Sequence, residues 1–122
     1  IPLPVTAAFH SAAMLPARDA MRERLLAAEL REPTVPILSN LDGAPMTAVG
    51  ELRAELADHI AAPVRWLDGM QRLESMGVSH AVEFGHGEVL TGMLRRTVEG
   101  IVTHNVGDVA DARHVAHELG HG

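Results

Sequence analysis

The sequence predicts an α/β fold with a mostly parallel sheet. Short β-branched apolar segments alternate along the chain with longer segments whose apolar residues recur at helical spacing. Such alternation favours parallel strands joined by helices. The chain has 122 residues, 47% of them hydrophobic and 21% charged, which is enough for a globular core. Because only 2% are aromatic, we expect that core to be aliphatic.

The first half of the chain is predicted to alternate between strands and helices. Prolines restrict the apolar start to an edge or entry strand. Apolar residues at helical spacing begin at Met14, and Pro33 ends that helix. The next helix carries Leu52, Leu56 and Ile60 on its apolar face. The expected elements are a strand at 1–5, a helix from Met14 to Pro33, a strand at 35–39 with a turn at 40–43, and a helix at 49–60.

The second half is predicted to contain two more strands and three helices. Gly77 is expected to end the first helix, and Asp108 to cap the last. The glycines of Gly85-His86-Gly87 suit a tight turn between a strand and a helix. The expected elements are a helix from Trp66 to Gly77, a strand at 80–84, a helix around 89–94, a strand at 101–106 and a helix from Val109.

Charge and residue usage exclude several classes of function. The formal charge is −6, and all ten basic residues are arginines, so a general nucleic-acid binder and a lysine Schiff base are not expected. The absence of cysteine excludes disulfides, cysteine nucleophiles and cysteine-based zinc sites, and it fits a cytoplasmic location. No apolar run approaches the ~18 residues of a membrane-spanning helix, so no membrane partner is expected.

The ending AHELGH has the spacing of a zinc-hydrolase motif. His117 and His121 stand at i and i+4, with Glu118 between them as a potential general base. His104 or His114 is a conceivable third ligand, but neither has a recognised spacing. A solvated, histidine-rich helix end is the favoured interpretation, and we expect no metal.

Two glycine-containing segments resemble catalytic or nucleotide-binding motifs. Gly77-Val78-Ser79-His80-Ala81 is close to a nucleophile elbow, but a helix precedes it and a strand follows, the reverse of the required order. Gly85-His86-Gly87 lacks the third glycine of a dinucleotide fingerprint. A helix end and a tight strand-to-helix turn are the favoured interpretations.

Four blocks resemble one family in order and spacing: LPVTAAFHSAAM, VPILSNLDG, HIAAPVRW and VEFGHGEVLTGMLRR. The family is malonyl-CoA:acyl carrier protein transacylase, the acyltransferase of fatty acid and polyketide synthesis. The resemblance covers nearly the whole chain but only the C-terminal portion of that enzyme. It implies that residues 1–122 are the C-terminal segment of an α/β-hydrolase-like acyltransferase core. The nucleophile-bearing N-terminal part and the ferredoxin-like insert are then absent, and the start at Ile1 fits a piece of a longer protein.

The resemblance also implies a ping-pong mechanism that moves malonyl from coenzyme A to the phosphopantetheine thiol of acyl carrier protein. His10 is implied to be the general base and acid, which suits an imidazole near neutral pH. The backbone carbonyl of His59 is implied to orient His10, and Phe9 to favour malonyl by leaving no room for an α-methyl group. Phe9 as a core aromatic is the equally weighted alternative. No cofactor is implied beyond the coenzyme A thioester and the carrier's phosphopantetheine.

The sequence departs from the family at two positions. His59 stands where the family usually has Gln, and His86 where it usually has Pro, from which we expect a small loss of stability. Asn40 is expected to tie the turn that follows its strand. None of the four serines stands in an elbow, so this chain alone is predicted to be inactive without the serine-bearing N-terminal half. A non-catalytic remnant, a carrier-protein docking module and, less favoured, a zinc hydrolase remain alternatives.

Overall fold

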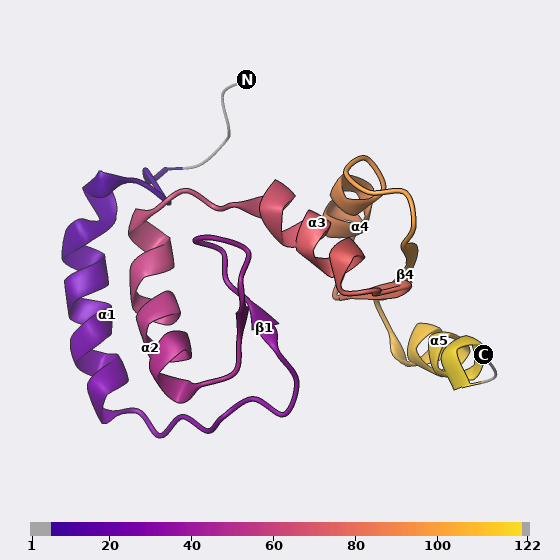
Figure 1. The fold of residues 1–122 in the computed structure, drawn as a ribbon, viewed down its shortest axis with the longest axis horizontal. Coiled ribbons are helices and arrows are strands. Elements are labelled where there is room, and N and C mark those ends of the chain that lie inside the picture. Colours follow the sequence, from indigo (N-terminus) through magenta and orange to yellow (C-terminus); the bar gives the residue numbers. More distant parts are fainter. Residues whose placement is uncertain (1–5, 121–122) are drawn as a thin grey trace. The chain divides into compact units, whose positions relative to one another are not determined.

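A computed structural model describes residues 6–120. The architecture is α/β, as predicted, with helices and two small sheets along the chain (Figure 1). The chain divides into two compact units, Ile1–Gly69 and Met70–Gly122, and each is described by itself. The strand expected at residues 1–5 lies outside the described residues.

The first unit is built on two helices that lie side by side, α1 and α2 (Figure 1). A short antiparallel hairpin between them in sequence pairs Ile37 with Met46 and Leu38 with Pro45. Its elements in chain order are η1 (Ala12–Met14), α1 (Leu15–Ala27), β1 (Ile37–Leu38), β2 (Pro45–Met46), α2 (Val49–Asp58) and η2 (His59–Ala61).

This unit differs from the sequence prediction in its sheet and in its first helix. The strand expected at 35–39 in a mostly parallel sheet is instead the shorter β1 of an antiparallel hairpin. Helix α1 ends at Ala27 rather than near Pro33, and the guanidinium of Arg53 donates two hydrogen bonds of 3.2 Å to the carbonyl of Ala28 just beyond that end. Strand β2 was not predicted, because two residues are too few to show a periodicity. Pro45 has no N–H group, which limits how far the β1–β2 ladder can extend.

The second unit is built on a parallel pair of strands with helices packed against it. The register runs from His80 opposite Val102 to Phe84 opposite Val106. Helix α4 contacts both strands and α5 contacts β4. The elements are β3 (His80–Phe84), α4 (Val89–Leu94), β4 (Val102–Val106) and α5 (Val109–Gly120), preceded by α3 (Trp66–Ser75), within which the two units meet in sequence.

The helix boundaries of the second unit follow the predicted signals. Gly77 has φ 76°, its N–H bonds to the carbonyl of Glu74, and the N–H of Val78 bonds to the carbonyl of Leu73. This is the Schellman arrangement that a glycine permits after a helix. The carboxylate of Asp108 accepts hydrogen bonds from the N–H groups of Ala110 and Asp111, which confirms the predicted cap of α5.

The buried apolar side chains are aliphatic, as predicted. Two of the three aromatic residues are exposed: Phe9 is 53% and Phe84 77% accessible. Within residues 6–120, none of the helices combines the length and apolar character needed to cross a membrane. The buried hydrophobic residues are Met46 and Ala57 in the first unit and Leu94, Val98, Ile101 and Val115 in the second.

Candidate functional site

His10 lies in the exposed segment that precedes η1, and its backbone is unusual. Its φ of 59° makes it the sole non-glycine residue with positive φ among the described residues. The left-handed region costs an L-residue about 1 kcal/mol, so neighbouring contacts must hold it there. The N–H of His10 donates to the carbonyl of Ile60 at 2.8 Å. This hydrogen bond holds the backbone of His10 in its left-handed conformation.

The ring of His10 is fixed by the adjacent carbonyl. Its Nδ1 lies 2.9 Å from the backbone oxygen of His59, 49 residues away in sequence. Because a carbonyl oxygen only accepts hydrogen bonds, this contact requires the proton on Nδ1. Nε2 of the neutral ring then carries a lone pair and is ready to accept a proton. The structure thus brings His10 and the His59 carbonyl together with the tautomer that a general base requires.

The side chain of His59 is directed to a different partner from its carbonyl. Its Nδ1 lies 2.9 Å from the carbonyl oxygen of Glu55, one turn back on α2. The two imidazoles have centroids 6.1 Å apart and planes tilted by 42°. The ring bonds to a carbonyl near the end of α2, while the backbone oxygen of the same residue bonds to His10.

A buried carboxylate on α2 supports the same region. Glu55 is 7% exposed, accepts a 2.9 Å hydrogen bond from the hydroxyl of Ser39, and accepts one of 2.6 Å from the N–H of Asn40. The carbonyl of Asn40 in turn accepts from the N–H of Arg65 at 2.7 Å. Asn40 therefore ties its turn through backbone groups. Sequence analysis missed Glu55, although an acid within the apolar periodicity of that helix is a usable signal.

Phe9, directly before His10, is not packed inside the core of this chain. Its 53% exposure leaves the ring open to solvent in the first unit. The interpretation of Phe9 as a core aromatic is therefore wrong for the residues described. Its proposed effect on acyl-group selection stays a prediction.

The glycine-containing segments of the second unit act as turns. Helix α3 precedes Ser79 and strand β3 follows it, so the order of a nucleophile elbow is reversed, as predicted. Gly85 and Gly87 have φ of 123° and 104°, which explains the glycines on both sides of His86.

The start of α4 is closed by the protein itself. The carboxylate of Glu83 on β3 accepts hydrogen bonds from the N–H groups of Leu90 and Thr91 and from the Thr91 hydroxyl. The hydrogen bond from the Thr91 N–H is the largest cause that holds the pKa of Glu83 below its usual value, and the other bonds act in the same direction. Desolvation raises the pKa by a smaller amount. An anion at this helix start would meet a carboxylate.

The histidine-rich ending forms contacts other than those of a zinc site. Glu118 lies 3.3 Å from Nδ1 of His104 and 3.4 Å from Nε2 of His114. His121 lies outside the described residues. Across residues 6–120, no group of three or more potential ligands is arranged to hold a metal ion.

Comparisons by sequence and comparisons by structure find the same kind of relative. A malonyl CoA-acyl carrier protein transacylase of Synechocystis sp. is 34% identical over 111 residues, which cover 91% of this chain and 38% of that protein. An acyl-carrier-protein-S-malonyltransferase structure from Bartonella henselae matches with a TM-score of 0.90 and 34% identity, covering 97% of this chain and 38% of that one. No protein-family model matches the chain.

A further structure contains a type II polyketide synthase acyl-carrier protein in complex with its malonyl-transacylase. It matches with a TM-score of 0.90 at 30% identity, over 97% of this chain and 38% of that one. The present chain thus spans little more than a third of the length of these relatives.

The fold and the matched region indicate the class: this chain is similar to the C-terminal part of α/β acyltransferase domains. More specifically, it is a homologue of the malonyl CoA-acyl carrier protein transacylases and matches their C-terminal region.

Proposed function

We propose that this chain supplies the histidine base of a malonyl transacylase, which moves malonyl from coenzyme A to the phosphopantetheine thiol of acyl carrier protein. The observation that carries the proposal is the pair of contacts that fix His10, from Nδ1 to the His59 carbonyl and from N–H to the Ile60 carbonyl. They leave Nε2 of the neutral ring as the proton acceptor. The homology to transacylases supplies the reaction class.

In the proposed first half-reaction, a serine hydroxyl attacks the malonyl thioester carbonyl. Nε2 of His10 takes the hydroxyl proton, the carbon–sulfur bond breaks, and that proton is returned to the leaving thiolate of coenzyme A. In the second half-reaction His10 takes the proton of the carrier's thiol, the thiolate attacks the acyl-serine, and the proton returns to the serine oxygen. The His59 carbonyl keeps the Nδ1 proton in place and stabilises the imidazolium that forms transiently.

The serine is proposed to lie outside this chain, on the N-terminal part of the acyltransferase. Serines 11, 39, 75 and 79 are the four in the sequence. The hydroxyl of Ser11 donates to the carbonyl of Ala8 at 2.7 Å, and that of Ser39 is engaged by Glu55. Neither Ser75 nor Ser79 lies in a strand-to-helix turn. A cytoplasmic location and the absence of a cofactor belong to the same proposal and rest on the resemblance.

Intact-mass spectrometry after incubation with malonyl-CoA tests the proposal. The chain is measured alone and with the N-terminal half of a homologous transacylase. A malonyl adduct on the added half only, lost with His10→Ala, is the expected result. An adduct on this chain alone would overturn the half-enzyme proposal. Association of the two halves without any adduct would favour the non-catalytic remnant or docking module instead.

A further inference from the structure

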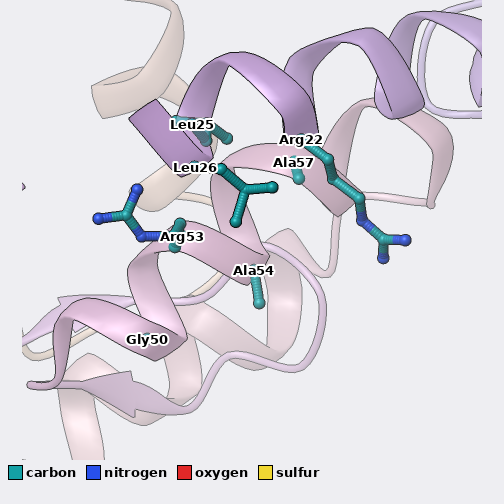
Figure 2. Close-up of a pocket in the computed structure, with 7 residues that line it drawn as sticks. All are labelled: Arg22, Leu25, Leu26, Gly50, Arg53, Ala54 and Ala57. Carbon is teal, nitrogen blue, oxygen red and sulfur yellow. The ribbon is translucent and has the colours of Figure 1, made fainter. Parts of the chain in front are cut away.

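A groove between α1 and α2 exposes apolar side chains on the first unit. Its volume is about 270 Å³, and it is open to solvent. Leu26, which is 77% exposed, projects from α1 toward α2. It lies between Arg53 at one end of the groove and Arg22 at the other (Figure 2). A contiguous exposed apolar surface, rather than a single exposed leucine, marks a candidate interaction site. The groove is lined by Arg22, Leu25, Leu26, Gly50, Arg53, Ala54 and Ala57.

The groove carries one arginine whose charge is not balanced by a carboxylate, Arg53, and a second, Arg22, that forms an ion pair with Asp58. Two arginines and no carboxylate are found among the described residues that line it, whereas the chain has a formal charge of −6. Arg53 donates to a neutral carbonyl, that of Ala28, so these bonds do not neutralise its charge. Arg22 pairs with Asp58 through Nη2 at 2.6 Å. Each guanidinium has five N–H donors, so both retain donors for a ligand.

An apolar floor between two guanidinium groups that retain N–H donors, Arg53 without a carboxylate partner and Arg22 beside Asp58, matches one kind of partner. Amphipathic helices bind in grooves through apolar residues spaced i, i+3 or i+4, and i+7, and their flanking charges select the groove. We propose that the groove between α1 and α2 binds an acidic amphipathic helix of a separate protein. Its apolar side chains contact Leu25 and Leu26, and its carboxylates pair with Arg22 and Arg53.

The charges disfavour a second copy of this chain as the occupant. A two-fold symmetric contact brings the same surface of both copies together, so that arginine would face arginine. The groove also has the length that the proposal requires. Helix α2 has ten residues and is therefore about 15 Å long, enough to contact about three turns of a bound helix. This inference concerns a surface other than His10 and does not depend on the proposed catalytic role.

The test uses the full chain and a synthetic, end-capped, fluorescent peptide of about 15 residues, a length at which an isolated helix is marginally stable. The peptide has leucines at i, i+4 and i+7 and glutamates on both flanks; a matched peptide has lysine at every glutamate. Fluorescence anisotropy measures binding. We expect saturable binding of the acidic peptide alone, weakened at about 1 M salt, where screening extends only about 3 Å.

Two variants localise the binding and one serves as a control. Arg53→Glu is expected to weaken binding about tenfold or more, and Leu26→Asp by a similar factor. Arg53→Glu removes the contact with Ala28 and could disturb the fold. Leu26 is largely exposed, so Leu26→Asp is expected to leave the fold intact. Arg24→Glu makes the same charge change on α1 outside the groove and is expected to have little effect. Circular dichroism checks the fold of each variant.

Several results would overturn the proposal. Equal binding of both peptides would show that charge does not select the partner, and an equal loss with Arg24→Glu would show that only net charge acts. Self-association that Leu26→Asp abolishes would make the groove an interface between copies. Displacement of the peptide by the added N-terminal half of a transacylase would make it an internal surface of that enzyme.

Discussion

Both units use one carboxylate to hold backbone N–H groups of another element, but the two carboxylates serve different ends. In the first unit Glu55, on a helix, holds the turn after β1. In the second unit Glu83, on a strand, holds the first turn of α4. Glu55 is 7% exposed and lies one helical turn before His59, whereas the bonds of Glu83 end at a short helix.

The two carboxylates differ in their distance along the sequence from His59, which contacts His10. Four residues after Glu55, the backbone oxygen of His59 lies 2.9 Å from Nδ1 of His10, so the carboxylate that holds the turn is on the helix that ends just before His59. The hydrogen bonds of Glu83, by contrast, join β3 to the start of α4 and to Asn105 of β4. We infer that the first network supports a site and the second supports packing.

The largest expected effect concerns the site itself. Asparagine tolerates the left-handed backbone of His10 and can donate to the His59 carbonyl, but it cannot act as a base. His10→Asn is therefore expected to lower malonyl transfer to the carrier protein about 10²- to 10⁴-fold when this chain is combined with an N-terminal half. Steady-state transfer assays measure it. A retained rate would remove His10 from the mechanism, provided that the unfolding temperature is unchanged.

The next effect separates the two networks by stability. Glu55→Ala leaves the Ser39 hydroxyl and the Asn40 N–H without their buried acceptor, at about 1–3 kcal/mol for each unsatisfied group. We expect a loss of about 3 kcal/mol in urea unfolding. Glu51→Ala is the matched control, because Glu51 is an exposed acid on the same helix and accepts from the exposed N–H groups of Thr47 and Ala48 just before it, which water can reach. Equal losses from both variants would refute the importance of burial.

A pair of glycines compares the two units under the same backbone constraint. Gly43 has φ 70° and Gly77 φ 76°, but a Cβ on Gly43 would lie 2.9 Å from backbone atoms of Asp68 and Gly69, whereas one on Gly77 meets nothing within 4 Å. Gly43→Ala is expected to cost about 3 kcal/mol, combining left-handed strain with overpacking, and Gly77→Ala about 1 kcal/mol. Urea denaturation of both variants checks the difference. Similar costs would show that the turn at Gly43 moves freely.

The second unit was predicted from the sequence more closely than the first. Its strands and helices are marked by local signals, such as Asp108 at a helix start and Gly77 at a helix end, which act within a few residues. The first unit depends on distant partners. Periodicity placed Leu56 on the inner face of α2, yet Leu56 is 41% exposed and its neighbour Glu55 is buried, because the acceptor is needed by Ser39 sixteen residues earlier.

The candidate site shows the same limit. His10 and His59 are 49 residues apart, and no spacing rule joins a loop histidine to a backbone carbonyl at the end of a helix. The resemblance alone suggested that pair. Neither the left-handed backbone of His10 nor the contact with Ile60 could be derived from residue types, because both arise from how η2 meets the segment before η1.

The smallest expected effect is a pH dependence in the second unit. The hydrogen bonds from Thr91 and Leu90 lower the pKa of Glu83 from 4.5, so the carboxylate stabilises the folded state. A lowered folded-state pKa means that this stabilisation is fully present above the unfolded pKa and is lost as pH falls through the folded one. Amide chemical shifts of Leu90 and Thr91 should therefore titrate below pH 4.5. In Glu83→Gln the titration should vanish, while the turn at Asn40 in the first unit should be unaffected. If these two amides instead titrate unchanged in the variant, Glu83 does not control the start of α4.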